Sequence, residues 1–152
     1  MLSGKLVQLI ETHWDQITNR VLGQIRRHPN MTHIAGRPDA ELREWGQMIL
    51  ENLGYWLTGG HEGELARAYE QLGKERFESG VPLSESVQGL CLVRENVLEF
   101  LGNHLLDKTT LDWYAEVETD RRLMRFFDVL TVHLVRGYER ALRNASALAM
   151  LP

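Results

Sequence analysis

The sequence predicts an all-α protein, and three observations support that fold class. Apolar residues recur at steps of three or four along most of the 152-residue chain, which places them on one face of a helix. No segment alternates apolar and polar residues in the manner of a strand. Only a few clusters of proline and glycine interrupt the helical periodicity. We therefore expect one domain over residues 1–152, built from five main helices.

The first helix is expected over residues 3–28. Ser3 is a plausible N-cap, and Pro29 disfavours a helical conformation for the residue before it. The apolar stripe of this helix comprises Leu6, Ile10, Trp14, Ile17, Val21 and Ile25. The segment that follows, with two prolines and Gly36, is expected to be a loop that ends at Pro38.

Three further helices are expected before residue 107. The second covers residues 39–58 and ends at a pair of glycines. The third covers residues 62–78, and Gly80 suits the left-handed position just beyond a helix end. The fourth covers residues 82–106 and has Pro82 in its first turn, where the missing N–H costs nothing.

The last helix is expected over residues 110–147, which is much longer than an average helix. Thr109 and Asp112 form a pattern like a capping box at its start. Its apolar residues cover more than one face between about Leu123 and Val135. A helix of this length usually packs against a second chain or leads to another domain.

The bulk properties exclude several functional classes. A net charge of −4 without a basic cluster argues against binding to nucleic acid or to an anionic membrane surface. We find no signal peptide and no long uncharged apolar run. The single cysteine, Cys91, excludes an intramolecular disulfide and suits a reducing cytoplasm. A cytoplasmic protein that binds neither DNA nor membranes is therefore expected.

Arg76 and Arg94 are the main candidate site residues, because each lies on the apolar stripe of its helix. A buried guanidinium needs a partner. That partner is either a carboxylate of the fold, with Asp120 as a candidate, or a small anionic ligand held by the guanidinium. Tyr69, on the stripe of Arg76, belongs to the same candidate site. We expect an Arg94→Ala substitution to cost on the order of 3–5 kcal/mol if it leaves a buried carboxylate unpaired.

Signatures of metal binding and catalysis are absent from the sequence. The six histidines show no ligand spacing, and no phosphate loop or catalytic triad can be read, so we expect no cofactor, no metal and no catalytic residue. A haem needs only one proximal histidine, and His104 or His133 could serve in that alternative.

Three short motifs give the chain a family resemblance. The sequences Leu72-Gly73-x-x-Arg76, Gly80-x-Pro82-Leu83 and Leu92-x-Arg94 resemble the N-terminal domain of RsbR/RsbRD-type proteins, the RsbT co-antagonists. The resemblance covers roughly residues 5 to 140. It implies a sensory or regulatory input module with a globin-like helical fold that lacks haem and precedes an output domain.

The same resemblance implies a homodimer formed by the first and last helices. The interface residues would be Leu6, Ile10, Trp14, Ile17, Val21, Met124, Phe127, Leu134 and Tyr138. We therefore predict a non-catalytic, dimeric sensor domain that passes a signal along its last helix to a signalling partner. The alternatives are a haem-binding globin-type sensor and a scaffold that binds a partner protein without sensing a signal.

Overall fold

The computed structural model describes residues 2–104 and 109–151, and these residues form eight α-helices and no strand. The helices are α1 (Leu2–Thr12), α2 (Trp14–Arg27), α3 (Thr32–Ala35), α4 (Asp39–Leu50), α5 (Leu53–Leu57), α6 (Glu62–Glu78), α7 (Leu83–His104) and α8 (Thr110–Ala149). The all-α class is confirmed for this part of the chain. The expected number of five helices is wrong, because two of the predicted helices are broken and the predicted loop contains α3.

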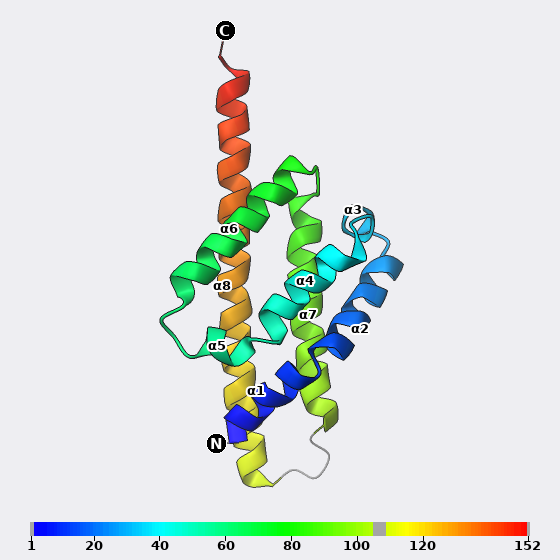
Figure 1. The fold of residues 1–152 in the computed structure, drawn as a ribbon, viewed down its shortest axis with the longest axis vertical. Coiled ribbons are helices and arrows are strands. Elements are labelled where there is room, and N and C mark those ends of the chain that lie inside the picture. The colour runs from blue at the N-terminus through cyan, green and yellow to red at the C-terminus, as the bar shows by residue number, and fades with distance from the viewer. Residues whose placement is uncertain (1, 105–108, 152) are drawn as a thin grey trace.

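The first predicted helix breaks at His13, which separates α1 from α2 (Figure 1). The His13 ring nitrogen Nδ1 lies 3.0 Å from the carbonyl oxygen of Leu9, to which the His13 backbone N–H also points. A side chain that approaches a backbone carbonyl of its own helix competes with the backbone N–H for that carbonyl, which is a known cause of a kink. The helix starts at Leu2, one residue before its predicted cap.

The second predicted helix breaks at Glu51 and Asn52, between α4 and α5. The indole Nε1 of Trp56 and the side-chain amide of Asn52 both donate to the carbonyl oxygen of Met48, at 2.9 Å and 3.4 Å. In a regular helix the backbone N–H of Asn52 would use that carbonyl. The two side-chain donors therefore replace one backbone hydrogen bond of the helix.

The short helix α3 depends on a residue that is distant in the sequence. The carboxylate of Glu85, at the start of α7, accepts hydrogen bonds from the backbone N–H groups of His33 and Ile34 and lies 2.6 Å from the His33 ring. These are N–H groups that a helix N-terminus leaves without partners. Glu85 is buried, so it fixes the 29–38 segment against the body of the protein.

The remaining predicted helices are close to those observed. Helix α6 has the predicted bounds, and α8 begins with the predicted capping box between Thr109 and Asp112. The expected end of the fourth helix at residue 106 lies outside the described residues.

Helix α8 is the axis of the molecule (Figure 1). Helices α1, α6 and α7 pack against it, while α2 packs against α4 and α7. The apolar core is formed by fully buried side chains on several helices, among them Ile10, Leu50, Leu101, Leu123 and Leu130. The last turns of α8 project beyond the other helices (Figure 1).

Two glycines allow α6 and α8 to cross in close contact. A Cβ atom added at Gly73 would overlap the carbonyl oxygen of Leu134, and one added at Gly137 would overlap the carbonyl oxygen of Glu70. Only glycine permits backbones to approach this closely. Gly73 is the glycine of the Leu72-Gly73-x-x-Arg76 motif, so this contact explains one of its residues.

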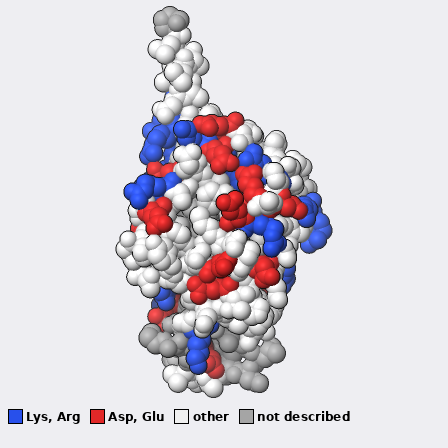
Figure 2. Space-filling view, viewed as in Figure 1, with Lys and Arg blue, Asp and Glu red and all other residues white. Residues whose placement is uncertain are grey.

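The surface carries charges of both signs. On the face shown in Figure 2 the acidic and basic side chains are interspersed, and the projecting end of α8 is mostly uncharged. Among the described residues, no helix is both long and apolar enough to cross a membrane.

Candidate functional site

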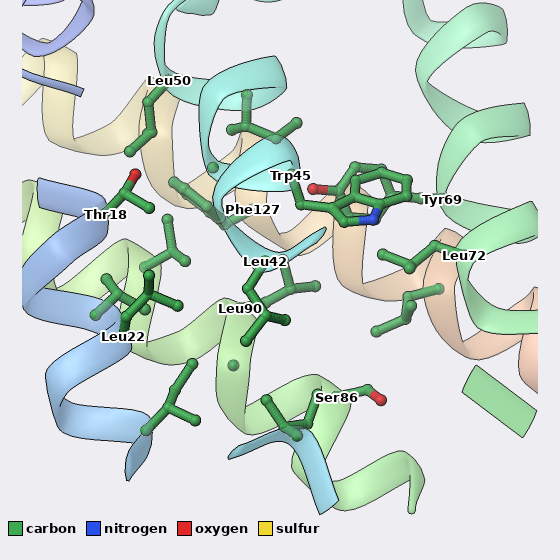
Figure 3. A pocket seen from close by; sticks show the side chains of 18 of the residues that line it. Thr18, Leu22, Leu42, Trp45, Leu50, Tyr69, Leu72, Ser86, Leu90 and Phe127 are labelled. Carbon is green, nitrogen blue, oxygen red and sulfur yellow. The ribbon is translucent and has the colours of Figure 1, made fainter. Parts of the chain in front are cut away.

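A cavity of about 100 Å³ lies where α2, α4, α6, α7 and α8 meet. Its wall is mostly aliphatic and aromatic, with Leu22 on α2, Leu42 and Trp45 on α4, Leu90 on α7 and Phe127 on α8 (Figure 3). Leu42, Trp45 and Leu90 are only half-buried, so this side of the cavity is nearest to solvent.

Two hydroxyl groups on the cavity wall lack hydrogen-bond partners among the described residues. The Thr18 Oγ1 atom is buried and unpaired, and Thr18 is 4% exposed. The Tyr69 side chain is 2% exposed, and its hydroxyl points from α6 into the cavity (Figure 3). Burial raises the pKa of Tyr69, although the charge of Arg76 opposes this, so the phenol is neutral at physiological pH.

Gly46 on α4 sets how closely α4 approaches α2 beside the cavity. A Cβ atom at position 46 would lie 2.6 Å from Thr18 Oγ1. The ring of Trp45, the preceding residue, packs edge-on against Tyr69 with ring centroids 5.3 Å apart. The α4 segment thus holds both hydroxyl-bearing side chains in place.

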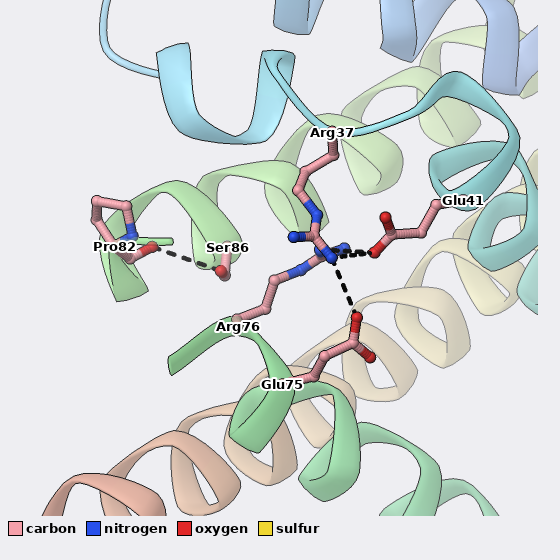
Figure 4. A network of polar contacts seen from close by, with 6 residues as sticks. All are labelled: Arg37, Glu41, Glu75, Arg76, Pro82 and Ser86. Carbon is pink, nitrogen blue, oxygen red and sulfur yellow. Dashed lines mark hydrogen bonds and ion pairs between the residues drawn. The ribbon is translucent and has the colours of Figure 1, made fainter. Parts of the chain in front are cut away.

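A network of ion pairs lies next to the cavity (Figure 4). Glu41 Oε1 accepts hydrogen bonds from Arg37 at 2.7 Å and from Arg76 at 3.1 Å. Arg37 also donates to Glu75 at 3.2 Å. Burial alone would raise the pKa of Glu41, but the hydrogen bonds and charges of the two arginines outweigh burial and lower that pKa. The four side chains carry two positive and two negative charges, so the network is electrically balanced.

The structure brings together only two of the four predicted site residues. Arg76 and Tyr69 both line the cavity, and the carboxylate partner of Arg76 is Glu41 rather than Asp120. Arg94 lies 3.9 Å from Asp128, with 31% and 73% of the two side chains exposed. Asp120 is half-buried on α8 and does not line the cavity.

The predicted interface residues fall into two groups. Three reach the surface at least in part: Met124 is 49% exposed, and Trp14 and Tyr138 are half-buried. The other six pack inside the chain itself, and these are Leu6, Ile10, Ile17, Val21, Phe127 and Leu134.

The two histidines of the haem alternative contact the protein itself. His133 Nδ1 lies 2.9 Å from a carboxylate oxygen of Glu70, and His104 Nδ1 lies 2.9 Å from the carbonyl oxygen of Phe100. Neither histidine lines the cavity. In the described part of the chain, no group of three or more His, Cys, Asp or Glu side chains is placed to hold a metal ion.

Comparison with known proteins defines the family to which the chain belongs. A family model described as the RsbT co-antagonist protein rsbRD N-terminal domain matches residues 15–148. The chain therefore belongs to this family, as the three motifs predicted, and is an input domain of the RsbT co-antagonist type of stress-signalling protein.

A second likeness involves a much larger protein. The chain is 31% identical over 102 residues to the E3 ubiquitin-protein ligase listerin of Gallus gallus, which is 66% of this chain but 5% of the ligase. The chain thus spans a small fraction of that relative's length. No solved structure matches the chain, so the expected globin-like arrangement of the helices stays a prediction.

Sequence reasoning missed most of the residues that shape the site. Arg37 and Glu41 are four residues apart, a spacing that favours pairing, yet nothing in the sequence connects them to Arg76. Gly46 lay inside a predicted helix, where a glycine is unfavourable and often marks a close contact. Nothing in the sequence marked Thr18 as a residue of the site, because its hydroxyl is left without a partner only when α4 packs against α2.

Proposed function

We propose that this protein is a non-catalytic sensory domain that acts as a homodimer and conveys a signal along α8. Membership of the rsbRD N-terminal family supports an input role. The geometry of α8 is the observation that carries the mechanism. Its inner face contributes Phe127 and Leu134 to the cavity and Gly137 to the crossing with α6. A structural change at the cavity or at the crossing with α6 would therefore move α8 itself, including its projecting end.

The outer face of α8 supports dimer formation. Trp113, Val117, Met124 and Leu142 are each about half exposed, at 55%, 48%, 49% and 47%. At 100° per residue these four positions fall within about 40° of one another on the helix surface. We call them the outer stripe of α8. Exposed apolar residues on one side of a long helix are a typical surface for packing against a second helix.

A second copy is the occupant that fits this stripe best. The stripe extends along most of one helix, and a two-fold axis would place identical apolar residues of two α8 helices against each other. The half-buried Tyr138 would lie at the margin of this interface. In this proposal Arg76 is a structural ion-pair residue, and the projecting end of α8 carries the signal to an output module or a partner signalling protein.

The proposal is tested by the oligomeric state in solution. Sedimentation velocity over a range of concentrations should show a dimer for the wild type and a monomer for the Val117→Glu/Met124→Glu variant. Leu111→Glu is the matched control, because Leu111 is 69% exposed on α8 but lies away from the stripe. It should remain dimeric. A wild-type monomer, or equal behaviour of the variant and the control, would refute dimerisation through the stripe.

A further inference from the structure

We propose that the cavity is the ligand site of this sensor and takes a small neutral molecule, mostly apolar, with one hydroxyl group and about the size of phenol. The inference deepens the proposed function, since it rests on that function for its meaning as a signal. The binding itself depends only on the cavity.

The size of the cavity suits a single-ring molecule. Its volume of about 100 Å³ is several times the roughly 10–15 Å³ that one water molecule needs. A dry engineered cavity of about 150 Å³ binds benzene, so a single ring is the upper limit of what this smaller cavity can hold. The aliphatic wall and the ring of Trp45 provide the apolar surroundings that small-molecule sites generally have.

The two unpaired hydroxyls indicate that the ligand carries a polar group. Three other threonines within helices satisfy their hydroxyls on the carbonyl four residues earlier, and these are Thr12, Thr119 and Thr131, at 2.7–2.9 Å. Thr18 does not, although its hydroxyl is buried. An unpaired buried hydroxyl destabilises a folded protein, because it has lost its hydrogen bonds to water without replacing them. A ligand hydroxyl that bonds to Tyr69 would give that phenol the partner it lacks, whereas Thr18 Oγ1 packs against Gly46 and would have to rotate to reach a ligand.

The charges beside the cavity favour a neutral ligand over an anion. Arg76 is the charged residue among the described residues of the wall, and it already donates to Glu41. Because the network of Arg37, Glu41, Glu75 and Arg76 is balanced, it offers no net positive charge. A buried carboxylate ligand would lose its hydration without a free counter-charge.

The experiment compares three probes of similar size by isothermal titration calorimetry: phenol, toluene and benzoate. We expect the wild type to bind phenol roughly tenfold more tightly than toluene, which corresponds to about one hydrogen bond. Benzoate should not bind measurably. Absence of binding by both phenol and toluene would refute the site, and tighter binding of benzoate would show that Arg76 selects an anion.

Two sets of variants locate the binding. Thr18→Val/Tyr69→Phe should reduce the preference for phenol over toluene to nearly none, while the matched control Thr119→Val/Tyr55→Phe should preserve it. Gly89→Leu should abolish binding of both probes, because Gly89 lines the cavity and an added Cβ would meet only Met31, at 3.9 Å. Gly102→Leu, on the same helix with open space around it, should bind normally.

Each variant result decides the inference. Unchanged phenol preference in the hydroxyl variant, or unchanged binding in Gly89→Leu, would place the ligand elsewhere. Sedimentation of the same samples separates the two proposals, because the cavity can bind phenol in a monomer and the dimer can form with an empty cavity.

Discussion

At the residue scale, Arg76 and Arg94 show that the position of an arginine on a helix does not determine whether its side chain is buried. Both lie on the apolar stripes of their helices. Arg76 is buried beside Glu41, and only 5% of its side chain is exposed. Arg94 lies on a part of α7 that α8 covers only incompletely, and its distant partner Asp128 is mostly exposed. Solvent therefore screens the Arg94–Asp128 pair more strongly than the Arg76–Glu41 pair, in which 5% and 23% of the side chains are exposed.

This difference predicts unequal costs of removing the two arginines. Arg76→Ala should lower the free energy of unfolding by roughly 3 kcal/mol, at the low end for a broken buried pair, because Arg37 remains beside Glu41. Arg94→Ala should cost less than about 1 kcal/mol, which corrects the larger loss expected from the sequence. Urea unfolding at pH 7 measures both values. Equal losses would contradict this account.

The lowered pKa of Glu41 predicts a dependence of stability on pH. A carboxylate whose pKa is lower in the folded protein stabilises it above the ordinary value of 4.5 and loses this contribution as the pH falls through the folded pKa. Glu41→Gln should therefore be less stable than the wild type at pH 7, and the difference should shrink below about pH 4.5. Thermal unfolding between pH 3 and pH 7 measures this difference.

The matched control for this experiment is Glu118→Gln. Glu118 is exposed on α8 and makes no ion pair with the described residues. Its substitution should leave stability nearly unchanged throughout the pH range. A Glu41→Gln difference that stays constant from pH 7 to pH 3 would show that the ion-pair network contributes no stability through the charge of Glu41.

At the element scale, the crossing of α6 and α8 is the contact that most restricts the sequence. Gly73 and Gly137 face the backbone of the opposite helix, and neither carbonyl oxygen can move aside as the end of a flexible side chain would. The crossing also fixes Tyr69 and Arg76, which lie one turn before and after Gly73 on α6. The geometry of the cavity thus depends on two positions without side chains.

We expect Gly73→Ala and Gly137→Ala each to destabilise the protein by about 3 kcal/mol, at the upper end of the cost of overpacking. The double variant should lose less than the sum, because both substitutions separate the same two helices. Gly102→Ala is the control: it lies in α7 with nothing within 4 Å of the added Cβ, and it should stabilise the helix by roughly 0.5–1 kcal/mol. Denaturant unfolding of the four variants tests this, and a neutral Gly73→Ala would contradict the close crossing.

At the scale of the whole molecule, α8 joins the features that matter for function. Its 40 residues span about 60 Å, from the capping box to the projecting end. The cavity, the α6 crossing and the outer stripe all use this one helix. Two sites on one rigid element are coupled only if binding at each site favours one position of that element over another. A small shift of α8 against α6 is the motion that would meet this condition.

The dimer prediction belongs to this scale, because only the whole of α8 presents the stripe. Two glutamates at positions 117 and 124 would bring four negative charges into a two-fold interface, so the dissociation constant of the dimer should rise far more than tenfold. Circular dichroism should show unchanged helix content, because both side chains are about half exposed in the isolated chain. Loss of helix together with loss of the dimer would instead indicate misfolding.

The helical class, the bounds of α6, the cap of α8 and the family could all be predicted from the order of the residues. These features depend on local spacing, on capping residues and on short motifs, which are all present in the order of the residues. The breaks at His13 and Asn52 escaped prediction, because side chains there compete with the backbone for individual carbonyl groups. Periodicity does not reveal such competition.

The pairing of charges, the choice of apolar side chains for the core and the place of the cavity depend instead on how the helices pack. Glu41 meets Arg76, and Glu85 caps α3, through contacts between residues far apart in the chain. Buried and exposed stripes have the same helical spacing, so the sequence did not distinguish Phe127 from Met124. That distinction arises when helices pack, because each helix buries only the face that its neighbours cover.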